Sequence, residues 1–172
     1  MQKEGNLVQL KRWKKRMGII DENPKWIVKT PPISISLSNE IASILRMTTG
    51  ENLVGERISI LPLADNGIIL LEKNDRILGS LLWMKINQLT ARVLGFGIHP
   101  EFQGKNLGSE CWKIFVKEIT QQDMNKITLE VRESNKRAIK FYQKKGLKPK
   151  GWIENYYQNE MGILMEIDSI KI

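Results

Sequence analysis

Apolar positions follow two different spacings along the chain. In the middle, apolar runs at residues 67–72, 77–86 and 89–98 are separated by the short polar steps Asn74-Asp75 and Asn87-Gln88. Short apolar runs broken by turn-forming residues are typical of strands joined by tight turns. The pattern therefore predicts an antiparallel meander of three strands in the middle of the chain.

Helical spacing flanks this meander. Residues 39–47 place Ile41, Ile44 and Leu45 on one face, behind a Ser/Asn pair that fits a helix cap. Residues 105–121 and 134–145 have the same periodicity, and Gly146 fits the end of the latter helix. Strands at 26–30, 126–131, 147–153 and 162–167 complete the prediction. Strands followed by strand–helix–strand–helix–strands indicate an α+β fold.

The first residues form a different kind of segment. Residues 7–17 combine helical apolar spacing with a dense basic cluster, which predicts a basic amphipathic helix that ends at Gly18. Two interpretations stay open: an arm that packs on its own domain, or a contact with RNA, a ribosome or a membrane. We accordingly divide the chain into an N-terminal arm, 1–24, and one domain, 25–172.

Composition narrows the class of protein. The 172 residues fit one domain, and 27 basic against 19 acidic residues give a net charge of +8, which favours polyanionic partners. A single cysteine excludes an internal disulfide framework and, with a single histidine, argues against a zinc site; no metal is expected. The chain has no apolar run long enough to span a bilayer and no signal-peptide core, so a cytoplasmic location is expected.

The strongest chemical signal lies between the third strand of the meander and the following helix. The strand ends at Ile98, and residues 103–108, Gln-Gly-Lys-Asn-Leu-Gly, lead into the helix. Free N–H groups and the positive end of the dipole make a helix start an anion site, and small residues let an anion approach the backbone. The sequence fits neither the P-loop nor the dinucleotide fingerprint. On this loop alone, a plain strand-to-helix turn stays open.

Two motifs in the right order carry a resemblance to a known family. The loop resembles the acetyl-CoA pyrophosphate loop of the GNAT superfamily, Q/R-x-x-G-x-G/A, with Gln103, then Asn106 where the first Gly is expected, then Gly108. Downstream, residues 129–142, L-E-V-R-E-S-N-K-R-A-I-K-F-Y, resemble the second GNAT block and most closely the ribosomal-protein N-terminal-alanine acetyltransferase group. If the backbone at Asn106 requires a positive φ, asparagine is the least costly substitute for glycine.

The resemblance implies a GNAT fold, with a central mixed sheet flanked by helices. It implies an N-acetyltransferase that moves the acetyl group of acetyl-CoA directly to an amine in a ternary complex. The expected acceptor is the N-terminal α-amine of a protein or peptide, with ribosomal proteins among the candidates. A basic helix at residues 7–17 would suit work near ribosomal RNA, and a contact with RNA or a ribosome stays one of its two open interpretations. An α-amine has a pKa near 8, against about 10.4 for lysine, so it loses its proton more easily.

The resemblance also assigns residues. Glu130 matches the proposed base, Tyr142 the proton donor to the departing thiolate, and Asn135 a cofactor hydrogen bond. Tyr156 and Tyr157 either line the acceptor pocket or only pack a hairpin. The backbone that would hold the acyl and pantetheine parts is that of Phe96, Gly97 and Ile98. The segment that would hold the pyrophosphate comprises Gln103, Gly104, Lys105, Asn106, Leu107, Gly108 and Ser109.

Several alternatives stay open on sequence alone. The acceptor could instead be a lysine side chain or a small-molecule amine, and the chain could be a non-catalytic CoA-binding or nucleic-acid-binding module on a GNAT scaffold. Lys105 and Lys113 either neutralise phosphates or are solvated helix charges. His99 is explained as the residue before a proline, and Cys111 as part of an apolar helix face, so neither is expected to take part in catalysis.

Overall fold

The computed structural model describes residue 17 and residues 23–51 and 53–170. The basic helix expected at 7–17 therefore lies outside the described residues, apart from Met17, as does its expected end at Gly18. The division of the chain at residue 24 stays a prediction. None of the helices in the described ranges is both long enough and apolar enough to cross a membrane.

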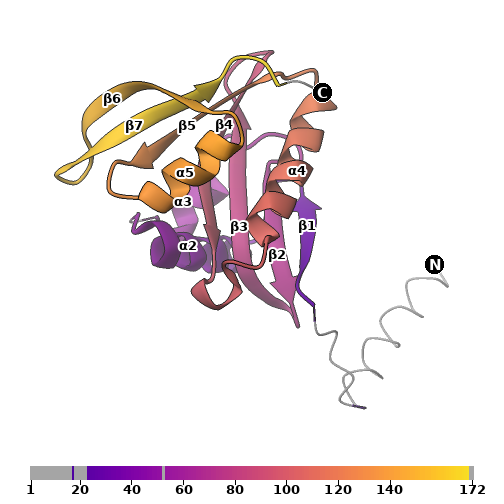
Figure 1. Ribbon diagram of the computed structural model, residues 1–172. Coiled ribbons are helices and arrows are strands. Elements are labelled where there is room, and N and C mark those ends of the chain that lie inside the picture. Colours follow the sequence, from indigo (N-terminus) through magenta and orange to yellow (C-terminus); the bar gives the residue numbers. More distant parts are fainter. Residues whose placement is uncertain (1–16, 18–22, 52, 171–172) are drawn as a thin grey trace.

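One mixed sheet of seven strands forms the centre of the structure (Figure 1). Its spatial order is β1-β2-β3-β4-β5-β7-β6, and every neighbouring pair is antiparallel except β4 and β5. The strands are β1 (Lys25–Lys29), β2 (Ile68–Lys73), β3 (Arg76–Lys85), β4 (Thr90–Ile98), β5 (Lys126–Arg132), β6 (Lys148–Tyr157) and β7 (Glu160–Ile167). The predicted meander is confirmed as β2-β3-β4.

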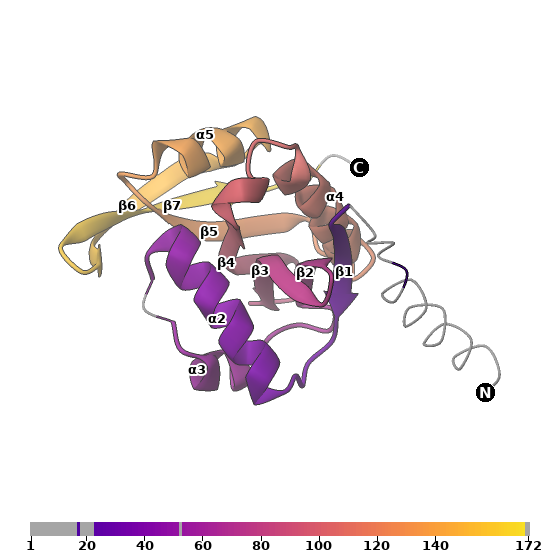
Figure 2. The same ribbon diagram turned by 90° about the horizontal axis from the view of Figure 1, so that it is seen from below.

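Helices cover both faces of this sheet. Figure 2 shows α2 (Ile35–Thr49) and α3 (Gly55–Ser59) on one face, and α4 (Leu107–Thr120) and α5 (Lys136–Lys144) on the other. The helices predicted at 105–121 and 134–145 are confirmed within two residues at each end. The short α3 and a 3₁₀ turn, Pro100–Phe102, were not predicted, because one helical turn is too short to show a periodicity.

The start of α2 differs from the prediction. The helix begins at Ile35, four residues earlier, and its cap is Ser34, whose hydroxyl accepts a hydrogen bond from the Leu37 N–H at 3.2 Å. Ser38, which the pattern suggested as a capping residue, is instead buried within the first turns. The alternation of serine and isoleucine hid this first turn, because serine suits either a cap or an inward-facing position.

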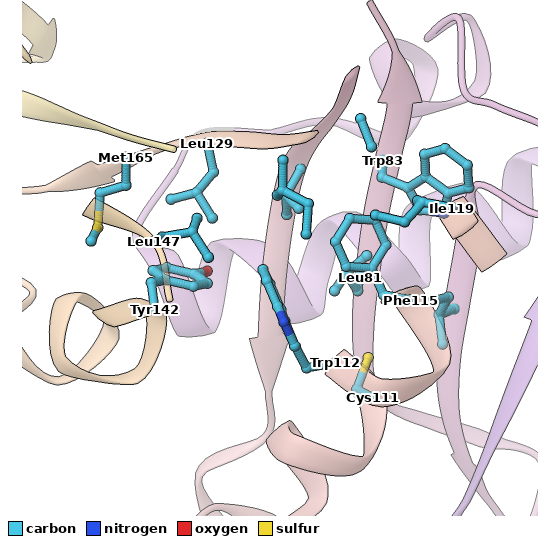
Figure 3. Close-up of a cluster of buried hydrophobic side chains, with 14 of the residues drawn as sticks. Leu81, Trp83, Cys111, Trp112, Phe115, Ile119, Leu129, Tyr142, Leu147 and Met165 are labelled. Atoms are coloured by element: carbon cyan, nitrogen blue, oxygen red, sulfur yellow. The ribbon is translucent and has the colours of Figure 1, made fainter. Parts of the chain in front are cut away.

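The core has two main parts, one on each side of the sheet. The larger part packs α4 and α5 on the sheet. Within it, the Phe115 ring makes edge-to-face contacts with Trp83 and with Trp112 (Figure 3). The predicted apolar face of α4 is confirmed, since Cys111, Phe115 and Ile119 are fully buried. The smaller part packs α2 and α3 on the opposite face.

The parallel pair β4–β5 stays together only over its first half. Four residue pairs are formed, the last between Val93 and Leu129, although β4 continues to Ile98 and β5 to Arg132. A β-bulge lies at this point: Leu82 pairs with Gly95 and Trp83 with Val93, so Leu94 is the extra residue on β4. Because a bulge bends its strand and increases its twist, β4 turns away from β5 beyond Val93.

Two fully buried serines on the α2 side of the sheet provide a test of this packing. The Ser38 hydroxyl donates to the Ser34 carbonyl at 3.1 Å, whereas the Ser80 hydroxyl, on β3, has no partner among the described residues. We expect Ser80→Ala to raise the free energy of unfolding by about 1 kcal/mol, because an unpaired buried hydroxyl is removed. Ser38→Ala is the matched control and should lower it by about the same amount.

Urea denaturation of the two variants measures both values. An equal loss of stability in Ser38→Ala and Ser80→Ala would show that the Ser80 hydroxyl has a hydrogen-bond partner in solution.

Candidate functional site

A cleft of about 490 Å³ opens where β4 and β5 diverge. Its floor is the end of β4, at Phe96, Gly97 and Ile98, whose edge has no strand partner beyond the Val93–Leu129 pair. Gly97 is required there, because a Cβ would overlap the Thr48 hydroxyl at the end of α2. The cleft therefore runs along a backbone edge that no strand pairs with, which suits a long ligand that carries amide groups.

The loop at the start of α4 forms one wall of this cleft. Gly104 and Asn106 have φ of +78° and +62°, so the positive φ considered at Asn106 is confirmed. Within the described residues, the backbone N–H groups of 104–108 donate to no acceptor, and the Asn106 side chain does not cap the helix. Several unpaired amides at a helix start form an anion-binding concavity. The cleft is lined from this loop by Gln103, Gly104, Asn106, Gly108 and Ser109.

Gln103 fixes the loop by its side chain. Its Nε2 donates to the Ile98 carbonyl at 2.7 Å, and its Oε1 accepts from Arg137 Nη1 of α5 at 2.6 Å. Both the N–H₂ group and the oxygen of the Gln103 side chain are thus hydrogen-bonded within the protein. Gln103 thus joins the end of β4 to α5 across the cleft, and it brings the positive charge of Arg137 to the cleft wall.

Two of the predicted loop residues direct their side chains elsewhere. Leu107 is buried against Leu71 and Leu78, and its carbonyl accepts from Trp26 Nε1 at 3.1 Å. The Lys105 ammonium lies 4.9 Å from the centre of the Phe102 ring. Neither side chain lines the cleft. Only the backbone N–H groups of these two residues are therefore without another contact among the described residues.

Asn135 and Tyr142 lie on the opposite wall. Asn135 caps α5, since its Oδ1 accepts from the Ala138 N–H at 3.1 Å, and this leaves the side-chain N–H₂ without a partner among the described residues. Tyr142 is 7% exposed at the edge of the large core (Figure 3), and its hydroxyl donates to no described group. Burial raises the pKa of Tyr142, so this hydroxyl holds its proton at neutral pH.

A second, much smaller cleft adjoins the first. The two share Phe96, Asn135, Ala138 and Tyr142, so Tyr142 lies where they meet. The small cleft is also lined by charged and aromatic groups from three separate parts of the chain: Glu51 after α2, Glu130 and Arg132 on β5, and Tyr157 on β6.

Glu130 lies in this small cleft within an ion pair. Its Oε2 accepts from Arg92 Nη2 at 3.0 Å and from Nε at 3.2 Å, while Oε1 has no partner among the described residues. Arg92 also donates to the Tyr156 hydroxyl at 3.1 Å. The Tyr157 hydroxyl donates to the Glu130 carbonyl at 3.1 Å and lines the cleft, whereas Tyr156 does not line it. The two tyrosines therefore differ: Tyr156 holds Arg92, and Tyr157 is part of the wall.

Arg132 joins the two sides of the small cleft. Its Nε donates to the Thr49 carbonyl at 3.1 Å and its Nη2 to the Gly50 carbonyl at 3.3 Å, at the end of α2. Its Nη1 pairs with Glu160 Oε2 at 3.3 Å, and the guanidinium lies 4.3 Å from the centre of the Tyr157 ring. One side chain thus holds the end of α2 against the β6–β7 hairpin.

Several lining residues were missed by sequence reasoning. Arg137, Ala138 and Phe141 lie within the second motif, two to six residues after Asn135, so helical spacing from Asn135 and Tyr142 could have found them. Thr48 and Glu51 gave no such signal. They reach the site only because α2 packs across β4, which no local pattern reveals.

Within the described ranges, His99 and Cys111 have structural roles, whereas Lys113 is a solvated helix charge. His99 Nδ1 accepts from the Glu101 N–H at 3.4 Å and caps the 3₁₀ turn. Cys111 is fully buried, and burial raises the pKa of its thiol. Lys113 is exposed. Partial burial of Lys145 lowers the pKa of Lys145, and the nearby charge of Lys113 lowers it further. Among the described residues, no three His, Cys, Asp or Glu side chains are grouped so as to hold a metal ion.

Comparison with known sequences gives a family. The profile of the acetyltransferase (GNAT) family matches residues 39–147. A Bacillus subtilis (strain 168) protein, provisionally named a ribosomal protein bS18 alanine N-acetyltransferase, is 31% identical over 90 residues. That match covers 52% of this chain and 58% of the relative, so it spans little more than half of the relative's length.

Three solved structures illustrate the similarity in fold. Ard1 from Thermoplasma volcanium has a TM-score of 0.76 at 20% identity, over 85% of this chain and 99% of that one. The ribosomal-protein-S18-alanine N-acetyltransferase of Escherichia coli has a TM-score of 0.70 at 17% identity, over 86% and 97%. Arabidopsis thaliana Naa50, bound to the bisubstrate analogue CoA-Ac-MVNAL, has 0.69 at 20% identity, over 82% and 98%. These likenesses confirm the expected fold.

The left-handed backbone at Asn106 leads to a test by substitution. Asn106→Gly should fold with unchanged or higher stability, whereas Asn106→Val should lower the free energy of unfolding by about 1–2 kcal/mol, because a β-branched residue is strained at positive φ. Thermal and urea denaturation measure the difference. Asn125→Val, at an exposed position without a positive φ, is the control. Equal losses at both positions would contradict a conformational origin.

The contacts of Arg132 predict a local effect. Arg132→Gln removes the bonds to the Thr49 and Gly50 carbonyls, so amide hydrogen exchange should speed up in residues 49–51 and in the β6–β7 hairpin. We expect a loss of about 1–3 kcal/mol in the free energy of unfolding, as for hydrogen bonds to a charged donor. Arg57→Gln, on the exposed side of α3, is the control. Unchanged exchange in both segments would rule out the bridging role of Arg132.

Proposed function

Because the chain belongs to the acetyltransferase (GNAT) family, we propose that it transfers the acetyl group of acetyl-CoA to an amine, and that the acceptor is the N-terminal α-amine of a protein. The observation that carries this proposal is the 490 Å³ cleft along the unpaired edge of β4, with unpaired amides from 104–108 at one end and Tyr142 at the other.

The large cleft fits acetyl-CoA in chemical terms. The amides of 104–108 and the charge of Arg137 suit a pyrophosphate, and the free edge of β4 suits the amide groups of pantetheine. The Asn135 side-chain N–H₂ provides one further donor on the facing wall. Apart from Arg137, these residues are among those that the sequence assigned to the cofactor. Gln103 would act indirectly, because its side chain holds the loop in position.

The small cleft fits the amine. It contains two carboxylates, Glu51 and Glu130, and the aromatic wall of Tyr157, which suit an ammonium group. Tyr142 lies between the clefts, where its hydroxyl would donate a proton to the sulfur that leaves the acetyl group. Since burial keeps Tyr142 protonated, it enters the reaction as an acid. The sequence assigns removal of the amine's proton to Glu130.

The acceptor class rests on relatives. The Bacillus subtilis relative is named for an alanine of ribosomal protein bS18, and the Naa50 structure contains an analogue that joins CoA to a peptide. An α-amine also needs less proton removal at neutral pH than a lysine side chain. We therefore place the N-terminus of a protein, with ribosomal proteins as first candidates, ahead of lysine or small amines, and we propose a cytoplasmic site of action.

An acceptor panel tests the proposal. The purified chain is incubated with acetyl-CoA and peptides that begin with alanine, the same peptides with blocked N-termini and an internal lysine, or small amines. We expect acetylation of the free α-amine, located by mass spectrometry. Tyr142→Phe should lower kcat by about 10²-fold or more while CoA binding by calorimetry is unchanged.

Three outcomes would contradict parts of this reading. Activity on small amines without activity on peptides would replace the acceptor. Absence of CoA binding would show that the chain is not an acetyltransferase but a binding module on the same fold. Full turnover in Tyr142→Phe would remove Tyr142 from the mechanism.

A further inference from the structure

The two carboxylates of the small cleft are not equivalent. Both charge-assisted bonds from Arg92 go to Oε2 of Glu130, which compensates the charge of that carboxylate. The carboxylate of Glu51 accepts no hydrogen bond and forms no ion pair with any described residue. Glu51 is only partly exposed and lines the cleft beside Glu130. The cleft thus holds one neutralised carboxylate and one whose charge has no direct partner.

Glu51 is held in place by backbone contacts. Its N–H donates to the Thr49 hydroxyl at 3.3 Å, and its carbonyl accepts from the Leu53 N–H at 2.9 Å. The two preceding carbonyls are bound by Arg132, which also binds the opposite wall. The backbone that carries Glu51 is therefore anchored on both sides, whereas its carboxylate has no hydrogen bond to a described residue. An ammonium group from an acceptor would complete this arrangement.

The surroundings of Glu51 favour a carboxyl group that exchanges protons. Burial raises the pKa of Glu51; Arg132 lowers it in part, and Glu130 raises it further. Tyr142 on α5 and Tyr157 on β6 face the same cleft, and the negative charge of Glu51 contributes to the raised pKa of both hydroxyl groups. A base works best when its pKa lies closer to the working pH than that of an ordinary carboxylate. The remaining groups that interact with Glu51 are Tyr156 on β6 and, through Glu130, Arg92 on β4.

We propose that Glu51 receives the acceptor's ammonium group and removes its proton, while Glu130, fixed by Arg92, orients the same amine through its free Oε1. This rests on the proposed function. The proton passes from nitrogen to the Glu51 carboxylate and then to solvent. The neutral amine attacks the acetyl carbonyl carbon, the C–N bond forms and the C–S bond breaks. Tyr142 protonates the leaving sulfur and regains a proton from the nitrogen, so the amide, the free thiol of CoA and one proton result.

Kinetics against pH separate the two carboxylates. We compare Glu51→Gln, Glu130→Gln and, as a matched control, Glu56→Gln on the exposed side of α3. With an alanine-first peptide, we expect the activity of the wild type to fall toward acid pH as the base is protonated. Glu51→Gln should lower kcat/KM by about 10²-fold or more and should abolish this fall. The KM for acetyl-CoA should stay constant. Glu130→Gln should raise the KM for the peptide and keep the acid limb, and Glu56→Gln should match the wild type.

Stability without any ligand gives an independent readout. When the folded state raises the pKa of a carboxyl group, the folded protein binds that proton more tightly than the unfolded chain does. Its ionisation therefore destabilises the folded state as pH rises through the unfolded-state and folded-state pKa values. Glu51→Gln should accordingly raise the urea midpoint at pH 8 and have little effect at pH 4. Lower activity with higher stability is the expected signature of a functional residue.

Two results would overturn the inference. If Glu51→Gln keeps the fall in activity toward acid pH, or loses stability at pH 8, Glu51 has a structural role only. If only Glu130→Gln loses that fall in activity, the base is Glu130. In either case the wild type still acetylates the peptide, and the proposed function stands. A wild type that acetylates no amine overturns the proposed function and this inference together.

Discussion

The divergence of β4 from β5 is the constraint on which the site depends. Two parallel strands that stayed paired to their ends would close the sheet and leave no backbone edge for a ligand. The bulge at Leu94 bends β4 directly after the last pair, Val93–Leu129, and so separates the strand ends. The seven-stranded sheet continues on both sides, because β3 supports β4 and β7 supports β5. The opening is therefore a local break within an otherwise continuous sheet.

This break places two different chemistries next to each other. The strand ends on the α4 side meet the loop at 104–108, where unpaired amides favour an anion. On the α2 side, Glu130 lines the small cleft beside Glu51, where carboxylates favour a cation. Tyr142 lies between the two environments. An anionic donor and a cationic acceptor can thus be bound close together, although the net charge of the chain is +8.

Stability and function compete in the small cleft. Arg132 and Arg92 are satisfied by several acceptors, which ties the end of α2, β4, β5 and the β6–β7 hairpin into one unit. The carboxylate of Glu51 is desolvated without a partner, which disfavours the folded state at neutral pH. This cost in stability is consistent with the role toward a ligand that we propose for Glu51.

The sequence by itself determined the local parts of this structure. Apolar periodicity found the meander and the two helices after it. The motifs around Gln103–Gly108 and Asn135–Tyr142 pointed to residues that line the large cleft, because each motif depends on residues close together in the chain. Only the tertiary structure decided the acceptor side. The end of α2 crosses β4 at Gly97, Arg132 binds carbonyls more than eighty residues away, and the bulge opens the sheet. These are contacts between distant segments, which no local pattern encodes, and they bring Glu51 to Glu130 and leave it without a partner.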